Sequence, residues 1–429
     1  MFSLLYKFFD FLGKKNNLLL LSPSYRSFGD KTEQIYFGLL HCQNYNKKLI
    51  LIKPFSRFFF KKISISNSSI YKLEHELIKK PSFLIDFILS LIVTLIGSYY
   101  FIYIKSINLY KKIFNLRDSE KSRINLSYAA TPKFGRSLLY EYFDGGKFNE
   151  SELRELETSF KSPTMPKKLI IKAEEFLKKN TPNALNKRWI VMHILDNTKT
   201  NYARGANIKN YKLGLKYLIS EGFHIFRIGD ANMPSINLDG LSDLTSINHE
   251  DYIDLYLLEN AYLYIGNQSG PAFTPHLFRR NSLITNGTDW STAIPRKKDN
   301  FFILKNFYNK KNNKRIPLKE IFKKEFNFQV NSDDISKRDI YLKENSAEDL
   351  LNSFKDYLNF IKGEKIFSSD QLSKSEIRKE WINNFLVSKE DLKINYSATN
   401  YEEYLRKRSI VLSSAEGKLA PSFVEKYWN

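Results

Sequence analysis

The alternation of short apolar runs with helix-like segments from Trp189 onward is the feature that most restricts the fold of this chain. Four runs have the length and composition of buried strands: 189–193 (WIVMH), 224–228 (HIFRI), 262–265 and 281–285 (NSLIT). Three segments between them have helical spacing: 209–220, 251–259 and 272–278. Strands that alternate with helices form a parallel sheet covered by helices, so we expect a Rossmann-like α/β domain here.

The N-terminal part repeats this order on a smaller scale. An apolar run at 17–22, a polar loop at 24–30, a helical pattern at 31–40 and a second run at 48–52 read as the opening of another parallel sheet. Beyond about residue 330 the pattern turns helical and polar, with its clearest helices at 347–361 and 373–386. We therefore expect three parts: an N-terminal Rossmann-like domain (1–182), a second Rossmann-like domain (183–330) and a helical C-terminal extension (331–429).

Several common chemistries lack their usual sequence signatures. The chain has no P-loop, no G-x-G-x-x-G after a strand and no G-x-S-x-G elbow, so kinase, NAD-dependent and hydrolase functions lose their support. The single cysteine, Cys42, excludes an internal disulfide and a cysteine-based zinc site. The six histidines contain no H-E-x-x-H pair, so we expect neither a protein-bound metal nor a cofactor.

Three polar or glycine-rich loops follow the expected strands of the second domain, where open parallel sheets bind their ligands. In the first loop, Arg204 lies just ahead of a helix that Asn207 could cap. A guanidinium group and free backbone N–H groups could converge there on an anion. An ordinary surface loop with a capped helix would have the same sequence.

The second loop begins where a strand ends in Arg227, with Gly229 and Asp230 close behind. An arginine at the end of a central strand needs a carboxylate or a phosphate to face. An internal ion pair with Asp230 is the alternative to a bound ligand.

The third loop, 265–271 (IGNQSGP), is the most informative of the three. Its small residues admit a ligand close to the backbone, and a helix N-terminus after Ser269, Gly270 and Pro271 would offer N–H donors to a diphosphate. A plain tight turn between strand and helix could use the same residues. His276, on the helix that follows, fits a structural role better than a ligand-binding one.

At these loops the chain resembles a bacterial glycosyltransferase family. Members carry R-[NG]-A-[ND]-I-x-x-Y, then [FV]-R-[IM]-G-D, then I-G-x-x-S-G-[PL], which stand here as 204–211 (RGANIKNY), 226–230 (FRIGD) and 265–271 (IGNQSGP). Order and spacing agree from Trp189 to Asn306, and weaker similarity continues through 316–321 and 421–424. One departure matters, because the family tends to have H-x-R-D where this chain has Leu195 in place of the arginine.

The loop 24–30 and the S-G-P turn are also similar to elements of lipopolysaccharide heptosyltransferases, which have the GT-B architecture of two Rossmann-like domains facing a cleft. That resemblance implies an N-terminal acceptor domain and a C-terminal nucleotide-sugar domain. It places Arg26 and Gly29 on the acceptor side and makes Asp30 a candidate general base. A helix cap before Lys31 is the structural alternative for Asp30.

The resemblance and the loops together predict a metal-independent glycosyltransferase of cell-surface polysaccharide or lipopolysaccharide synthesis. Its donor would be a nucleotide diphosphate sugar and its acceptor a glycan or a lipid-linked glycan. We expect the donor to meet these residues: Arg204, Asn207, Tyr211, Arg227, Asp230, Ser269, Gly270, Pro271 and His276. Two alternatives are an inactive scaffold that kept the fold, suggested by Leu195, and a basic nucleic-acid-binding protein, for which the chain carries no known motif.

The segment 87–104 carries no charge and is about long enough to cross a hydrocarbon core. Lys79 and Lys80 precede it and Lys105 follows it, which favours a membrane-associating helix over about 83–104. Ser90 and Thr94 within the segment leave three readings open: a buried core helix, insertion into one leaflet, and a full span.

The formal charge of +21 favours anionic partners. The segment 1–15 could form an amphipathic helix on a membrane or on its own domain, and 57–62 (RFFFKK) could contact lipid or form a strand edge guarded by lysines. A cytoplasmic enzyme held against the anionic inner membrane would account for both the surplus charge and the apolar first domain, and we expect no nucleic-acid partner.

Overall fold

The computed structural model describes residues 16–23, 28–58, 61–62, 65–95, 150–196, 203–288, 295–321, 339–375 and 415–429. The chain divides into two compact units. Unit 1 comprises Met1–Pro166 with Ser388–Ile410, and unit 2 comprises Lys167–Val387 with Val411–Asn429. The expected helix over 1–15 and the candidate residue Arg26 lie outside the described residues.

Unit 2 is built around a seven-stranded sheet in which all neighbouring strands run parallel. The strand order is β13-β10-β9-β8-β5-β6-β7. The strands are β5 (Trp189–His193), β6 (His224–Arg227), β7 (Leu241–Asp243), β8 (Leu263–Gly266), β9 (Asn281–Gly287), β10 (Phe301–Leu304) and β13 (Lys418–Leu419). The predicted α/β class with a parallel sheet is confirmed for this unit.

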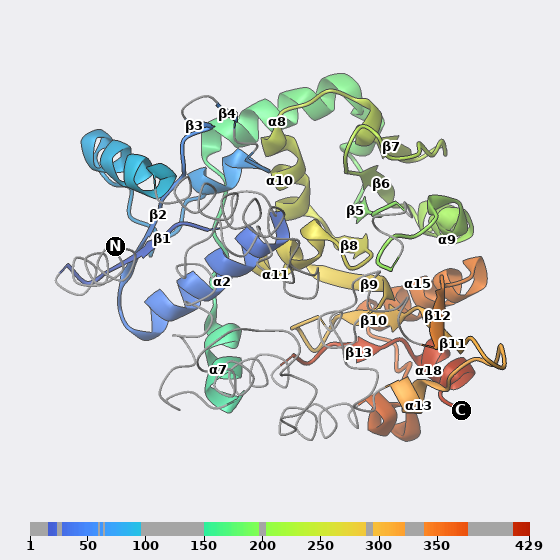
Figure 1. The fold of residues 1–429 in the computed structure, drawn as a ribbon. Coiled ribbons are helices and arrows are strands. Elements are labelled where there is room, and N and C mark those ends of the chain that lie inside the picture. Colours follow the sequence, from blue (N-terminus) through green and yellow to red (C-terminus); the bar gives the residue numbers. More distant parts are fainter. Residues whose placement is uncertain are drawn as a thin grey trace, which may run out of the picture. The chain divides into compact units, whose positions relative to one another are not determined.

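Helices cover both faces of this sheet (Figure 1). Helices α9 (Lys212–Ser220) and α15 (Ala347–Ile361) lie together on one face, while α8 (Lys167–Asn180) and α10 (Asp251–Asn260) lie on the other. α9 and α15 approach closely at Gly214, where an added Cβ would lie 2.5 Å from the ring of Phe354. Shorter helices complete the unit: η3 (Pro182–Ala184), η4 (Ile208–Tyr211), η5 (Leu244–Ser246), η6 (Gly270–Phe273), α11 (Thr274–Leu277), α13 (Leu318–Ile321) and α18 (Pro421–Tyr427).

The strand order gives this sheet a topological switch point. From β5 the chain moves outward through β6 to β7, and then returns to the other side of β5 to form β8, β9 and β10. This is the strand order of dinucleotide-binding Rossmann sheets, in which ligands bind outside the carboxyl ends of the two strands where the direction reverses. In unit 2 those two strands are β5 and β8.

The described residues beyond 330, at 339–375 and 415–429, belong to unit 2. β11 (Asn306–Asn309) and β12 (Ile340–Lys343) form an antiparallel pair, and β13 extends the main sheet beside β10. The expected helix 347–361 is confirmed as α15, which begins with a capping box of Ser346 and Asp349. Residues 369–375 are helical, and the remainder of the expected helix 373–386 lies outside the described residues.

The described part of unit 1 contains the expected β-α-β opening. β1 (Leu18–Leu21) and β2 (Lys48–Leu51) pair in parallel around α2 (Phe28–Asn44). β3 (Arg57–Phe58) and β4 (Lys61–Lys62) form a short antiparallel hairpin, followed by η1 (Ser68–Lys72), and α7 (Glu150–Ser159) comes later. Within the described residues of unit 1 the parallel pairing amounts to two strands and one isolated bridge from Leu49 to Ile78.

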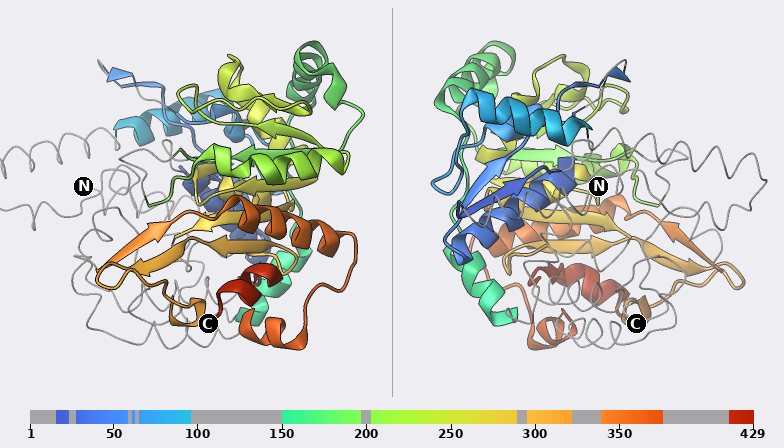
Figure 2. Two further views of the ribbon diagram at one scale, coloured as in Figure 1. Left: turned by 90° about the vertical axis from the view of Figure 1, so that its right-hand side faces the viewer. Right: turned by 60° about the vertical axis from the view of Figure 1, so that its left-hand side comes forward.

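Residues 83–95 of unit 1 are helical and lie beside its strands, drawn in light blue in Figure 2. Leu89 is buried against Ile50 and Ile52 of the strand region, and Ile92 and Val93 pack against the same cluster. One face of this segment is therefore buried, as expected for a core helix, which is one of the three readings that the sequence left open. Across the described ranges, no helix combines the length and the apolar character needed to cross a bilayer.

Candidate functional site

Two loops meet at the switch point of the unit 2 sheet, one after β5 (193–195) and one after β8 (266–271). We call them the switch-point loops. His193, the last residue of β5, and Ser269 are joined by a hydrogen bond of 2.8 Å between Nδ1 and Oγ. The register places His193 opposite Gly266, so the two strands end at the same level.

Asn267 fastens the two loops together. Its side chain is fully buried; Oδ1 accepts from the backbone N–H of Leu195 at 2.9 Å, and Nδ2 donates to the carbonyl oxygens of Leu195 at 3.0 Å and Arg204 at 2.9 Å. The backbone of the Arg204 loop is therefore held at the switch point, while the Arg204 side chain is exposed. These three hydrogen bonds of its side-chain amide explain why the I-G-N-Q-S-G-P segment has an asparagine at this position.

Arg227 is buried at the end of β6, with 1% of its surface exposed. Its Nη1 lies 2.7 Å from Oδ2 of Asp243, its register neighbour on β7. The suggested internal partner, Asp230, is exposed, so the ion pair forms across the sheet to a residue that the sequence did not indicate. The Nε atom of Arg227 is buried and has no hydrogen-bond partner.

The Asp243 carboxylate is held ionised by its surroundings. Burial opposes its ionisation, but hydrogen bonds from Thr245 and from the backbone of Ile236, together with Arg227, outweigh burial and lower its pKa below the ordinary value. Arg227 is thus neutralised within the fold, and a ligand at this edge would meet its unpaired Nε and not a free guanidinium group.

His193 is neutral at physiological pH. Burial, reinforced by the nearby charge of Arg227, lowers its pKa to about 4. A neutral imidazole can accept or donate at Nδ1, so its bond with Ser269 orients both side chains at the switch point. The sequence placed His193 in a strand and assigned it no role; its position as the last residue of the expected strand 189–193 was the available signal.

Gly266 is required by the tyrosine two residues before it. An added Cβ at Gly266 would lie 2.3 Å from the hydroxyl oxygen of Tyr264, closer than any contact between real atoms permits. That hydroxyl is buried; burial raises the pKa of Tyr264, and the side chain of Ser269 opposes the shift. The Tyr264 hydroxyl therefore lies near the same Ser269 side chain that His193 contacts.

Two of the expected donor-binding residues hold the structure together instead of facing a free site. Asn207 caps η4, accepting from the N–H of Lys209 at 3.0 Å, and its own N–H donates to Oε2 of Glu344 at 2.7 Å. Tyr211 is fully buried, and its hydroxyl lies 2.7 Å from Oγ1 of Thr285 and 2.9 Å from Nδ2 of Asn286. The expected cap is confirmed, whereas a contact from Tyr211 to a ligand would require these bonds to be exchanged.

The Tyr211 hydroxyl belongs to a larger buried network. Asn286 and Asn345 exchange backbone-to-side-chain hydrogen bonds of 2.8 Å in both directions, and Nδ2 of Asn345 donates to the carbonyl oxygen of Leu304 at 2.7 Å. Thr285 Oγ1 donates to the carbonyl oxygen of Gly266 at 3.2 Å. We call Tyr211, Thr285, Asn286 and Asn345 the closed network.

The helix expected after the S-G-P turn is short and irregular. It consists of the 3₁₀ turn η6 followed by the single turn α11, so its dipole is much weaker than that of a full helix. Pro271 is buried, while Ser269 and Gly270 are partly exposed. His276 is buried, Nδ1 has no partner, and burial with the charges of Arg296 and Lys297 lowers its pKa to about 3.

Lys305 is a cation at this edge that the sequence did not reveal. It follows β10, is 2% exposed, and its Nζ donates to the carbonyl oxygen of Gly205 at 2.6 Å. Burial lowers its pKa to about 8, against the opposing effect of Glu344. The chain around Arg204 is thus held from two sides, by Asn267 and by Lys305.

The acceptor-side residues lie in unit 1, at the start of α2. This helix begins at Phe28, so Asp30 belongs to its first turn and does not cap a helix that starts at Lys31. The Gly29 carbonyl oxygen accepts from Oγ1 of Thr32 at 2.8 Å. Lys31 is fully buried, and its Nζ donates to the carbonyl oxygens of Ser66 and Asn67. The Asp30 side chain lies outside the described residues.

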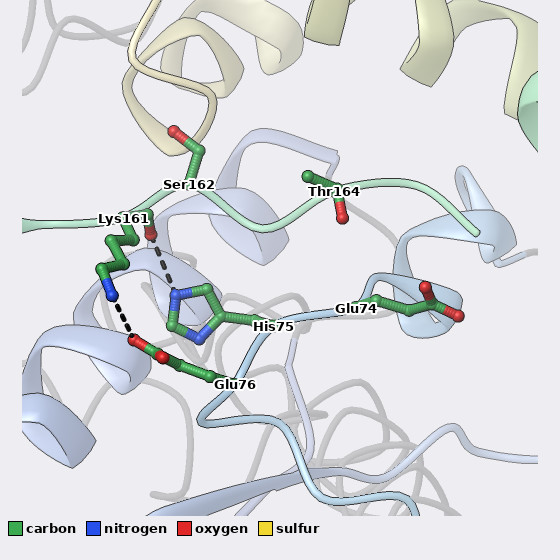
Figure 3. Close-up of a pocket in the computed structure, with 6 residues that line it drawn as sticks. All are labelled: Glu74, His75, Glu76, Lys161, Ser162 and Thr164. Carbon is green, nitrogen blue, oxygen red and sulfur yellow. Dashed lines mark hydrogen bonds and ion pairs between the residues drawn. The ribbon is translucent and has the colours of Figure 1, made fainter. Parts of the chain in front are cut away.

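Unit 1 also has an open hollow of about 440 Å³, lined by Glu74, His75, Glu76, Lys161, Ser162 and Thr164 (Figure 3). Both ring nitrogens of His75 are engaged, since Nδ1 accepts from the N–H of Leu77 at 3.0 Å and Nε2 lies 3.1 Å from the carbonyl oxygen of Lys161. Lys161 pairs with Glu76 at 3.1 Å. These contacts tie two segments together and leave His75 with no free nitrogen for chemistry.

Comparison with protein-family models, with curated proteins and with solved structures finds no match to this chain. Nor do three or more histidine, cysteine, aspartate or glutamate side chains come together as metal ligands in the part of the chain that the structure describes. The switch-point loops, with Arg227 and Lys305 at the same edge of the sheet, are the arrangement best placed to receive a ligand.

Proposed function

We propose that this protein is a glycosyltransferase that moves a sugar from a nucleotide diphosphate donor to a glycan or lipid-linked acceptor in cell-surface polysaccharide or lipopolysaccharide synthesis. The observation that carries the proposal is the switch point of a sheet with the Rossmann strand order, where the loop after β8 carries the I-G-N-Q-S-G-P segment that resembles a glycosyltransferase motif. Unit 2 would bind the donor and unit 1 the acceptor, in a GT-B arrangement.

The chemistry of the proposed reaction needs positive charge at the departing diphosphate. Arg204 is exposed beside the switch-point loops, and its backbone is fixed by Asn267, so its guanidinium group can swing onto a phosphate without cost to the fold. The N–H groups of 269–271 and the unpaired Nε of Arg227 would supply further donors. On the acceptor side, Asp30 is the proposed base that removes the proton of the attacking hydroxyl.

An inactive scaffold with the same fold remains the second candidate, and two observations favour it. Leu195 stands where the related family has an arginine, and Arg227 is already neutralised by Asp243. In this case the fold would keep a binding role without transfer of a sugar.

The proposed enzyme would lie on the cytoplasmic side of the inner membrane.

A panel of UDP-, GDP-, CDP- and dTDP-sugars tests donor binding by the shift in melting temperature of the full chain. We expect one nucleotide class to raise the melting temperature by several degrees at saturation. Arg204→Ala should weaken that binding about tenfold or more, because a charge-assisted hydrogen bond to phosphate is lost. Release of the nucleoside diphosphate in the presence of an acceptor then separates an enzyme from an inactive scaffold.

Arg188→Ala is the matched control. Arg188 is also exposed, but it directly precedes β5 and so lies at the amino ends of the strands of the same sheet. Its guanidinium group lies 5.0 Å from the ring centre of Tyr262. It should leave donor binding unchanged. Equal effects of the two substitutions, or no thermal shift with any nucleotide sugar, would count against the donor site.

A further inference from the structure

Unit 1 exposes a large apolar surface on the helical segment 83–95, and this surface is not needed for the proposed sugar transfer. Five side chains spaced as one helical face point outward along it: Leu84, Phe87, Ile88, Leu91 and Leu95, which are 66%, 47%, 45%, 39% and 46% exposed. We call them the apolar stripe. Phe83 and Ile85 in the first turn are also exposed, at 86% and 51%. Soluble proteins rarely leave so many large apolar side chains together in water.

The opposite face of the same segment is fixed to the body of unit 1. Leu89 is buried against Ile50 and Ile52. Thr94 Oγ1 donates to the carbonyl oxygen of Ser90 at 2.7 Å and accepts from the backbone N–H of Phe55 at 2.9 Å. Because one face of the helix is packed against unit 1, only the opposite face is free to contact a partner. Such a partner would lie along the length of the helix.

The charges around the apolar stripe are predominantly basic. Lys79 is exposed just before the helix begins, whereas the Nζ of the neighbouring Lys80 donates to the carbonyl oxygens of Tyr71 and Leu73. Phe55, whose ring lies 5.4 Å from that of Phe87, precedes by two residues the hairpin of β3 and β4, whose sequence carries Arg57, Lys61 and Lys62. Asp86 is the acidic residue within the segment, and at about 100° per residue it lies roughly opposite the apolar stripe.

We propose that the apolar stripe docks unit 1 onto an anionic lipid bilayer, with the segment 83–95 lying in the plane of the interface. An apolar face inserted below basic residues combines the two attractions that hold peripheral proteins on anionic membranes. The net charge of +21 adds a longer-range attraction of the same sign. A second copy fits less well, because pairing two stripes would bring the basic residues of both copies together.

A fluorescent probe on the stripe tests this directly in the full chain. The native Cys42 is buried, and burial raises the pKa of its thiol to about 12, so an NBD label will react selectively with an introduced cysteine. NBD on Leu91→Cys should shift to the blue and brighten when vesicles of phosphatidylcholine with phosphatidylglycerol are added. NBD on Leu213→Cys, an equally apolar and 48% exposed position in unit 2, should not change.

Vesicle flotation provides the second measurement. Leu84→Ser combined with Leu91→Ser should lower binding to the anionic vesicles about tenfold or more, while Ile171→Ser combined with Leu213→Ser should not. Binding should also weaken with added salt and with pure phosphatidylcholine. The double stripe variant removes surface side chains, so a folded, monodisperse variant that floats as well as the wild type would overturn the proposal.

One further outcome would also overturn it. A dimer of the wild-type chain that becomes monomeric in the Leu84→Ser, Leu91→Ser variant, without any lipid, would assign the apolar stripe to a second copy. The inference does not depend on sugar transfer, since vesicle binding can succeed or fail whether or not a nucleotide sugar stabilises unit 2.

Discussion

Two neighbouring regions at the carboxyl edge of the unit 2 sheet treat buried polar groups in opposite ways. In the closed network, Tyr211 and Asn286 use their side chains in hydrogen bonds of 2.9 Å or less, and Asn345 completes the set. Beside the switch-point loops, Arg227 Nε is buried with no hydrogen-bond partner. A complete hydrogen-bond network is explained by folding alone, whereas an unpaired buried polar atom needs an explanation of its own, for which a bound ligand is one candidate.

This difference shows why the three sequence motifs do not give equal support for a ligand-binding site. The R-G-A-N-I-K-N-Y motif ends in Tyr211, which belongs to the closed network, so part of this motif is explained by folding alone. The I-G-N-Q-S-G-P motif contains Ser269, whose hydroxyl pairs with a neutral histidine at the switch point. Three experiments test this division, with the substitutions ordered from the largest expected effect to the smallest.

Among the substitutions, Asn345→Ala should have the largest effect, lowering the stability of unit 2 by about 3 kcal/mol. The substitution leaves the N–H of Asn286 and the carbonyl oxygen of Leu304 buried without partners. Hydrogen exchange of the β9 and β10 amides measures the change. Asn237→Ala, at an exposed loop position, is the control and should alter exchange by less than about 0.5 kcal/mol. A small effect at Asn345 would mean that the closed network is not structural.

Acid should weaken unit 2 through His193, His224 and His276. Burial lowers their pKa values to about 4, about 4 and about 3, so the unfolded chain binds protons that the folded chain does not. The stability they contribute is complete above the ordinary histidine pKa of about 6.5 and falls by about 1.4 kcal/mol per pH unit for each histidine as pH drops toward 4. Urea unfolding at pH 7, 6 and 5 measures the slope.

His193→Asn separates the contribution of His193 from those of His224 and His276 in this titration. The variant keeps a short polar side chain beside Ser269 but cannot gain the proton, so its stability should fall less steeply between pH 6.5 and 4. The same slope in the variant and the wild type would show that His193 is not buried in its neutral form. A nucleotide sugar that binds at the switch-point loops should also change this slope.

The smallest effect is expected from a matched pair of tyrosines. Tyr211 and Tyr264 are both fully buried, but the Tyr211 hydroxyl has two hydrogen-bond partners, Thr285 and Asn286, whereas the neighbour of the Tyr264 hydroxyl is the Ser269 side chain. Tyr211→Phe should cost about 1 kcal/mol and Tyr264→Phe less than about 0.5 kcal/mol. Tyr264→Phe should also relieve part of the overlap created by Gly266→Ala. Equal costs for the two tyrosines would erase the distinction between the regions.

Much of the fold could be predicted from local patterns. The strand 189–193 and the helix 347–361 have the expected bounds, because apolar period and capping residues are local signals. β13 was missed because two residues carry no periodicity, and its place beside β10 depends on pairing across the chain. The antiparallel pair of β11 and β12 was missed for the same reason.

The candidate site was harder to predict, because its contacts are not local. The sequence indicated the loops after β5, β6 and β8, and the structure brings the first and third together through Asn267. The partner of Arg227 is Asp243 and not Asp230, because β7 lies beside β6 in a register that no local pattern encodes. No sequence motif marks Lys305, because its burial results from its position directly after β10.

The placement of β13 beside β10 has a consequence for synthesis on the ribosome. When β5 to β10 have emerged, the main-chain groups of Phe301 and Phe302 that later pair with Lys418 and Leu419 still face outward. A nascent chain therefore exposes an apolar strand edge for as long as it takes to translate the residues between β10 and β13. Chaperone binding during this interval would protect the chain from aggregation until its last strand closes the edge.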